Sequence, residues 1–312
     1  MSLKSALQWR KLYYKDQFYK LVNYLLRFYE IFGKEEIKSV SVVVVGRNDN
    51  YGGDFSKRLQ VTLDWNLSHL PNPELIYVEW NPLSDRPSDC TWISERYKNS
   101  KCFIVPNEIH KVIAHDPEKM KVMEYFAKNL GIRKASSDWI ILTNADVLIG
   151  PDMIGNIKSL NKDFIYGGHY VNILWDGDAI DEYYFKDKKI VKNSFSAYLT
   201  FQSTVGNFIL TNKKNWMTST GYDENLNKSR AGVDTNGYLQ LKKLNLITRI
   251  IGHHFHLDHP ESIINVANLE SHGDRSQMID NRNIPYKNRE YWGLADYPLK
   301  QISEKIWELQ AI

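Results

Sequence analysis

Hydrophobic residues recur with two different periods along this chain, and the change falls near residue 39. Over residues 1–38 the spacing is helical, which predicts an amphipathic N-terminal helical extension. Its apolar positions are Phe18, Leu21, Val22, Leu25, Phe28 and Phe32, and its basic residues are Lys4, Arg10, Lys11, Lys15, Lys20 and Arg27.

Two roles fit this extension. A basic, aromatic amphipathic helix can lie on an anionic membrane surface as a peripheral anchor. It can also pack against the body of the protein, or against a second subunit in a homo-oligomer. The packed role is favoured, because an apolar stripe on a helix usually faces a core.

Strand-like and helical segments alternate from residue 39 onward. The β-branched run at 39–45 is typical of a strand buried on both faces. Three more strands are predicted at 75–78, 102–105 and 139–142, with helices at 55–67 and at 116–131, the latter opening with Asp116 as N-cap and closing at Gly131. This order predicts an α/β fold, with a mainly parallel central sheet flanked by helices.

The second half of the chain is less regular. No linker or change of composition divides residues 39–298, so we expect one domain there. Residues 299–312 are predicted to form a C-terminal helix, because Ile302, Ile306 and Leu309 fall on one face at helical spacing.

Composition narrows the class of protein. A net charge of +3 over 312 residues, without a basic stripe, disfavours nucleic-acid binding. Two cysteines, Cys90 and Cys102, lack metal or redox spacing and suit a reducing compartment. No run of 18 apolar residues and no secretion signal is present, so we expect a cytoplasmic protein, at most peripheral at the inner face of a membrane.

A polar triplet interrupts the hydrophobic stretch ILTNADVLIG, residues 141–150. Ligands of parallel sheets bind beyond the carboxyl ends of the strands, where Arg47, Glu79 and Asp146 all fall. A carboxylate such as Asp146, preceded by Asn144, can hold a hard divalent cation against a diphosphate. A helix cap at a strand end explains the same two residues, so the motif alone leaves both interpretations open.

The stretch GHHFHLDHP, residues 252–260, is the second informative segment. In an extended chain His254, His256 and Asp258 share one face, an arrangement suited to a metal or a phosphate. Histidines hydrogen-bonded within a core are the alternative. The clustering favours a cation site that uses His256 first and His254 second.

Four segments in order carry a family resemblance: VSVVVVGRNDNYGGDFSKRLQ, LIYVEWNP, AKNLGIRKASSDWIILTNAD and GNFILTNKKNWMTSTGYDENL. Over roughly residues 39–260 the chain resembles the GT-A fold nucleotide-sugar glycosyltransferases, especially their inverting family 2 branch. Asn144-Ala145-Asp146 stands at that family's Asp-x-Asp position, and Gly232-Val233-Asp234 resembles its Glu-Asp catalytic segment.

The resemblance implies a Rossmann-like GT-A domain that moves a sugar from a nucleotide diphosphate sugar, with UDP expected, to a hydroxyl of a glycan or glycolipid acceptor. Inversion and a divalent cation, Mn²⁺ or Mg²⁺, are implied with it. Residues 39–150 would bind the donor and 151–298 the acceptor. The implied site residues are Arg47, Asn48, Glu79, Arg133, Asn144 and Asp146 for the donor; Asp146, Asn144, His256 and His254 for the cation; Gly206, Asn207, Asp223 and Glu224 for the acceptor; and Asp234 as the base.

The chain departs from the family's pattern at several positions. Asn144 replaces the usual first Asp, which lowers the negative charge offered to a cation, and Val233 replaces the usual Glu before Asp234. Two rival functions therefore stay open: a degenerate GT-A protein that binds sugar or scaffolds a complex, and a sugar nucleotidyltransferase. The loop GRNDNYGGD fits the phosphate loop of a nucleotidyltransferase poorly, and retention of Asp146, Asp234 and the histidines speaks against decay.

Overall fold

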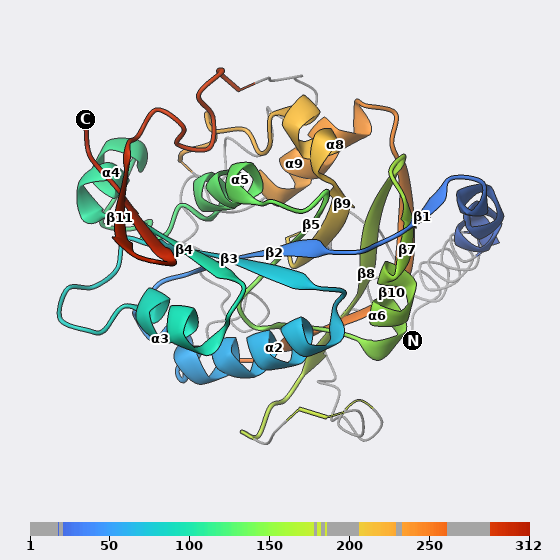
Figure 1. Ribbon diagram of the computed structural model, residues 1–312, viewed down its shortest axis with the longest axis horizontal. Coiled ribbons are helices and arrows are strands. Elements are labelled where there is room, and N and C mark those ends of the chain that lie inside the picture. The colour runs from blue at the N-terminus through green and yellow to red at the C-terminus, as the bar shows by residue number, and fades with distance from the viewer. Residues whose placement is uncertain are drawn as a thin grey trace, which may run out of the picture.

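The computed structural model describes residues 18, 21–177, 180–181, 185, 206–228, 233–260 and 288–312. Within them one ten-stranded sheet organises the molecule (Figure 1). Its strands, in spatial order, are β11 (Leu299–Ser303), β12 (Ile306–Leu309), β4 (Ser100–Val105), β3 (Pro73–Trp80), β2 (Val40–Gly46), β5 (Trp139–Thr143), β9 (Phe208–Asn212), β8 (Phe164–Ile173), β10 (Ile247–Leu257) and β6 (Val147–Ile149).

Five neighbouring strands of this sheet, from β12 to β5, run parallel to one another. β9 is antiparallel to both β5 and β8, β10 is parallel to β8, and β6 is antiparallel to β10. Strands from both halves of the chain thus join in one sheet. The predicted α/β fold with a mainly parallel central sheet is confirmed.

Helices cover both faces of the sheet (Figure 1). α2 (Phe55–His69) and α3 (Asp89–Arg96) lie on one face, and α5 (Glu124–Lys134), α8 (Lys213–Ser219) and α9 (Val233–Lys242) lie on the other. Successive valines of β2 alternate between the two layers: Val42 packs in the core with α2, and Val43 in the core with α5. Shorter elements complete the described chain: α4 (Asn107–Ile113), α6 (Pro151–Ile157), and a two-stranded sheet of β1 (Lys34–Glu36) and β7 (Ser159–Asn161).

The helix predicted at 116–131 begins and ends later than expected. It starts at Glu124 and continues through Gly131 to Lys134. Gly131 is a packing residue rather than a helix stop, because a β-carbon there would lie 2.3 Å from Cγ1 of Val43. The missing side chain lets α5 press closely against β2.

The C-terminal helix predicted over 299–312 is wrong: the segment forms the hairpin β11–β12. β12 pairs in parallel with β4 and extends the sheet, so Ile306 and Leu309 are buried while Ile302 is 49% exposed. Ladder hydrogen bonds to a sheet edge, which local spacing does not reveal, outweigh the helical pattern here.

The N-terminal helix forms over the described residues 21–31, and most of its large apolar residues are exposed, although Tyr29 lies against Phe164 on β8 with ring centroids 6.2 Å apart. Leu21, Leu25 and Phe28 are each more than half exposed, so the stripe is not buried on this chain, and packing against a second subunit stays a prediction. Much of the extension, residues 1–17 and 19–20, lies outside the described residues. None of the helices in the described ranges is both long enough and apolar enough to cross a membrane.

The hairpin predicts unequal effects for two alanine substitutions. Leu309→Ala removes a side chain that is 1% exposed and should lower the free energy of unfolding by about 2–4 kcal/mol. Ile302→Ala should change it by less than about 0.5 kcal/mol, because that side chain is half exposed. Urea unfolding of the two variants measures both; equal costs would support a terminal helix with both residues on its buried face.

Candidate functional site

The site is built where β2, β3 and β5 end at the same edge of the sheet. β5 stops at Thr143, and the chain leaves the sheet through residues 144–146 before β6 begins at Val147. Because parallel strands place their following loops together, this exit lies beside the loops that begin at Arg47 and Asn81.

Helix α2 holds the backbone around Asp146 in place. Thr62 donates to the carbonyl of Ala145 at 2.6 Å, and Trp65 donates to that of Ile149 at 2.8 Å. The amide of Asn66 donates to the carbonyl of Val147 and accepts from the N–H of Ile149, both at 2.8 Å. These bonds satisfy backbone groups that the short strand β6 leaves without a neighbour on that side. The backbone that carries the Asp146 side chain is therefore held in place by α2.

Asp146 lies next to two histidines: His256, near the end of β10, and His259, just after it. Its Oδ2 is 3.5 Å from Nε2 of His256 and 3.2 Å from Nε2 of His259. All three side chains are buried, and their ligand atoms lie within 4.8 Å of one another, close enough to share a metal ion. One carboxylate oxygen and two imidazole nitrogens are a donor set that Mn²⁺ and other divalent first-row ions accept.

The charge state of the cluster suits a cation. Burial alone would raise the pKa of Asp146, but the attraction of His256 and hydrogen bonds from both histidines outweigh it and hold the pKa well below its usual range. The carboxylate is therefore ionised at neutral pH, as a metal ligand must be.

Asn172 sets the tautomer of His256. Its Nδ2 donates to the carboxylate of Asp258 at 2.9 Å, and an ionised carboxylate can only accept. The amide oxygen of Asn172 consequently faces Nδ1 of His256, at 2.7 Å, and accepts the proton that this nitrogen carries. Nε2 is therefore the nitrogen that faces Asp146, and it is the atom that a metal ion would take in place of a proton. Such outer contacts orient metal-binding histidines.

The loop after β2 contacts the third member of the cluster. Tyr51 packs edge-on against His259, with ring centroids 5.0 Å apart. Gly52 has a φ of +64°, and a β-carbon there would lie 2.4 Å from Nδ1 of His259, so the approach requires glycine. Arg58, buried on α2, donates to the carbonyls of Tyr51, Gly52 and Gly53 and fastens this turn.

The predicted ligand His254 lies outside this group, and His259 takes the place expected for it. His254 is fully buried, and neither ring nitrogen has a hydrogen-bond partner in the described part of the chain. Burial, followed by repulsion from His169, lowers its pKa to about 3, so the ring stays neutral. Strand alternation correctly put His254 and His256 on one side, where both contact Tyr170. It could not find His259, because that residue follows the end of β10.

A buried lysine links the loop after β5 to the second half of the chain. Lys128 is 1% exposed, and its Nζ donates to Oδ1 of Asn144 and to the carbonyl of Gly206, each at 3.1 Å. Its charge is paired with Glu124 at 2.5 Å. Asn144 also donates to the side chain of Asn207 at 3.1 Å, so both ends of its amide are engaged. The predicted donor residue Asn144 and acceptor residues Gly206 and Asn207 are thus brought together, although Asn144 does not face the histidines.

Asp234 lies at the start of α9, next to Gly206. A β-carbon on Gly206 would lie 2.3 Å from a carboxylate oxygen of Asp234, so the two segments meet closely. Burial raises the pKa of Asp234, and backbone N–H groups and the charge of Lys128 offset this only in part. A carboxylate with a raised pKa is a better proton acceptor near neutral pH than an ordinary aspartate. Lys128, which sequence reasoning did not single out, therefore connects Asp234 to the loop that carries Asp146.

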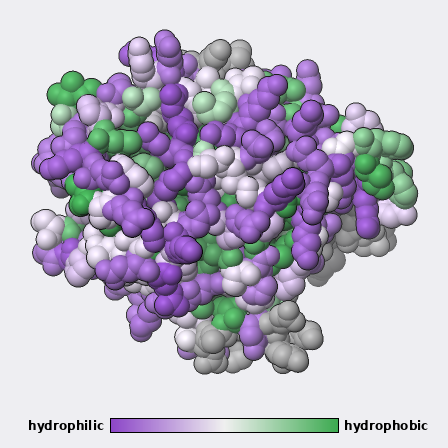
Figure 2. Space-filling model, in the orientation of Figure 1, coloured by the Kyte–Doolittle hydropathy of each residue, from purple (hydrophilic) through white to green (hydrophobic). Residues whose placement is uncertain are grey.

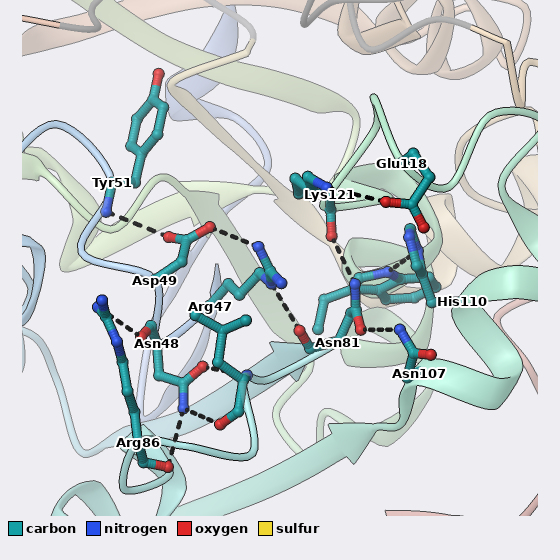
Figure 3. Close-up of polar contacts among 12 residues, drawn as sticks. Arg47, Asn48, Asp49, Tyr51, Asn81, Arg86, Asn107, His110, Glu118 and Lys121 are labelled. Atoms are coloured by element: carbon teal, nitrogen blue, oxygen red, sulfur yellow. Dashed lines mark hydrogen bonds and ion pairs between the residues drawn. The ribbon is translucent and has the colours of Figure 1, made fainter.

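Figure 3 shows the polar contacts around the loop that follows β2. Arg47 lies between Asp49, which accepts from its Nη1 at 2.9 Å, and the carbonyl of Asn81, which accepts from its Nε at 2.6 Å. The predicted donor residue Asn48 uses its side chain differently. Its amide exchanges two hydrogen bonds with the backbone of Leu83, at 2.6 and 3.0 Å, and so ties two loops together.

The predicted donor residues Glu79 and Arg133 have other partners. Glu79 is fully buried, and its carboxylate accepts from the hydroxyl of Ser88 and, at 2.8 Å, from the N–H of Asp89, so that it caps α3. Arg133 lies near the end of α5, which returns to the opposite edge of the sheet. There its guanidinium lies 5.2 Å from the centre of the Trp292 ring. The structure does not bring either residue to the Asp146 cluster.

Two predicted acceptor residues form local supports. Asp223 accepts from the backbone and side-chain nitrogens of Asn225, both at 2.9 Å. Glu224 accepts from Asn129 on α5 at 2.9 Å and from the N–H of Gly293 at 2.7 Å. They join the segment before α9 to α5 and the C-terminal region. An acceptor-binding role for them stays a prediction.

No protein-family model matches this chain. No curated protein matches it either. Among solved structures it is similar to residues 1–349 of TarS from S. aureus, at 13% identity and a TM-score of 0.42, over 70% of this chain and 60% of that one. It is also similar to the mannosyltransferase PcManGT from Pyrobaculum calidifontis, solved in complex with GDP-Man and Mn²⁺, at 14% identity and a TM-score of 0.43.

The second similarity covers 71% of this chain and 57% of the mannosyltransferase. This chain therefore spans a little over half the length of the structures that it resembles. Both similarities are weak and carry no argument about function.

The contact between Asn172 and His256 predicts an effect on metal affinity. Asn172→Ala leaves Asp146, His256 and His259 intact but removes the acceptor that fixes the tautomer, so Mn²⁺ should bind roughly 10–100-fold more weakly. Isothermal titration calorimetry with Mn²⁺ measures this. Asn156→Ala is the matched control, because Asn156 bonds to the carbonyls of Asp152 and Ile251 and does not contact the cluster. Unchanged Mn²⁺ affinity in Asn172→Ala would contradict the assigned tautomer.

Proposed function

We propose that this chain is a metal-dependent glycosyltransferase, which moves a sugar from a nucleotide diphosphate sugar to a hydroxyl of a glycan or glycolipid acceptor. The observation that carries the proposal is the buried cluster of Asp146, His256 and His259 at the carboxyl edge of a parallel sheet. Through Asn144, Lys128 and Gly206 this cluster is connected to a carboxylate, Asp234, that is suited to accept a proton.

The donor would lie across the ends of β2 and β5. A divalent cation held by Asp146, His256 and His259 would act as a Lewis acid on the departing diphosphate. The hydrogen bond from His256 to Asn172 orients the imidazole ring for that role. The turn at residues 51–53, which Arg58 holds through hydrogen bonds, places Gly52 against His259. Arg47, one strand away, offers a positive charge that Asp49 and the Asn81 carbonyl hold in place for the nucleotide.

Asp234 is the proposed base for the acceptor. An acceptor hydroxyl would attack the anomeric carbon and transfer its proton to the Asp234 carboxylate, while the bond from that carbon to the diphosphate oxygen breaks. A single displacement of this kind inverts the anomeric configuration. The close approach to Gly206 and the neighbouring charge of Lys128 hold the carboxylate in position.

The donor site predicts nucleotide binding that depends on the metal. Isothermal titration with UDP, GDP and CMP, each with and without Mn²⁺, should reveal one nucleotide, UDP by our expectation, that binds tightly only with the metal. Asp146→Ala should weaken that binding at least about tenfold, because the only carboxylate of the cluster is lost.

The matched control for this titration is Asp152→Ala. Asp152 forms a partly exposed pair with His253 at 2.6 Å, which is an Asp–His contact like those of Asp146 but outside the cluster. Its replacement by alanine should therefore leave nucleotide binding unchanged. Metal-independent binding, or no binding of any of the three nucleotides, would reject the proposed donor site.

The proposed base predicts a loss of transfer without a loss of donor binding. Asp234→Asn should lower kcat roughly 10²–10⁴-fold, while metal-dependent nucleotide affinity stays within about twofold of wild type. In the wild type, kcat should fall as the pH drops through the pKa of Asp234. Burial raises that pKa, so the fall should begin at a higher pH than for an ordinary aspartate. A variant that transfers sugar at the wild-type rate would exclude Asp234 as the base.

A further inference from the structure

The N-terminal helix is attached to the protein through polar residues. Asn23 forms two hydrogen bonds with the backbone of Ile250, one to the carbonyl and one from the N–H, both at 3.0 Å. Glu30 is fully buried, forms an ion pair with Arg249 and accepts from the hydroxyl of Tyr166 at 2.8 Å. These contacts fix which side of the helix faces β8 and β10.

The opposite side of this helix is apolar and exposed. We define the outer face as the six side chains that lie there, each 53–90% exposed: Phe18, Leu21, Tyr24, Leu25, Phe28 and Phe32. At 3.6 residues per turn they cover an arc of roughly 120°, centred nearly opposite Asn23 and Glu30. In Figure 2 a hydrophobic patch lies at the right edge of the molecule, where Figure 1 places this helix. The usual order, apolar side inward and polar side outward, is therefore reversed.

The surrounding sequence is strongly basic. Residues 1–33 contain six Lys and Arg and only two acidic residues, although the whole chain has a net charge of +3. One of the two acidic residues, Glu30, is already paired with Arg249 in the interior. The sequence of the extension therefore carries an excess of positive charge, and one of its basic residues, Arg27, lies on the described helix.

We propose that the outer face docks on the surface of a lipid bilayer that contains anionic lipids. Phe, Leu and Tyr side chains of such a helix bury themselves at the boundary between headgroups and acyl chains, and the basic residues interact with the lipid phosphates. The basic sequence favours an anionic lipid surface over a second copy of this chain, because two copies would bring like charges together. This docking is independent of the proposed function, since neither Asp146 nor Asp234 takes part in it.

Vesicle co-sedimentation of the full chain tests the docking. The protein should sediment with vesicles of phosphatidylcholine and phosphatidylglycerol, much less with phosphatidylcholine alone, and less again when salt is raised to about 0.5 M. Leu25→Glu should lower partitioning into the anionic vesicles roughly tenfold or more, because it places a charge in the buried layer. The variant should keep its fold, because Leu25 is 57% exposed.

The matched control is Val112→Glu, which introduces the same charge at a residue that is 76% exposed on α4. It should bind vesicles like the wild type. Failure of the wild type to prefer anionic vesicles, or undiminished binding by Leu25→Glu, would overturn the proposal. A wild-type dimer in light scattering that Leu25→Glu makes monomeric, without vesicle binding, would instead assign the outer face to a second copy of this chain.

Discussion

The backbone between β5 and β6 leaves the sheet inside the protein, and its polar groups must still find hydrogen-bond partners. Helix α2 supplies these partners from the side chains of Thr62, Trp65 and Asn66, while the N–H of Leu257 on β10 donates to the carbonyl of Asp146 itself at 2.9 Å. These bonds fix the backbone of residues 145–149, and the carboxylate that this backbone carries lies against His256 and His259 at the end of β10. His256 and His259 lie around that carboxylate, and Asn172 and Gly52 contact these two histidines from the outside.

A second constraint is the burial of Lys128. An ammonium group that is removed from water needs a nearby negative charge and further acceptors, and it obtains them from Glu124, Asn144 and the carbonyl of Gly206. This accounts for Asn144, which stands where the resembled family has its first Asp. The amide oxygen of Asn144 accepts a hydrogen bond from Lys128, and its amide nitrogen donates one to the side chain of Asn207. An aspartate at this position could accept the first bond but could not donate the second, because an ionised carboxylate has no proton.

The two ends of the described chain show how tertiary contacts override a local pattern. The helical spacing of Ile302, Ile306 and Leu309 gives way to a hairpin, because the open edge of β4 offers ladder hydrogen bonds. The helical spacing near the N-terminus does produce a helix. Its orientation, however, is set by the polar contacts of Asn23 and Glu30 with the sheet, which the spacing of apolar residues does not predict.

The sequence by itself determined the α/β fold, the parallel core and the approximate places of its strands, because β-branched runs such as 39–45, separated by helical segments, are typical of strands buried on both faces of such a sheet. It also pointed to Asp146 and His256, since both follow from position relative to a strand. Only the tertiary structure decided that His259 joins them in place of His254, that Lys128 connects them to Asp234, and that Glu79 and Asn48 serve as structural ties. The physical reason is that periodicity describes which way neighbouring side chains point. Distances between loops more than a hundred residues apart depend instead on the packing of whole elements.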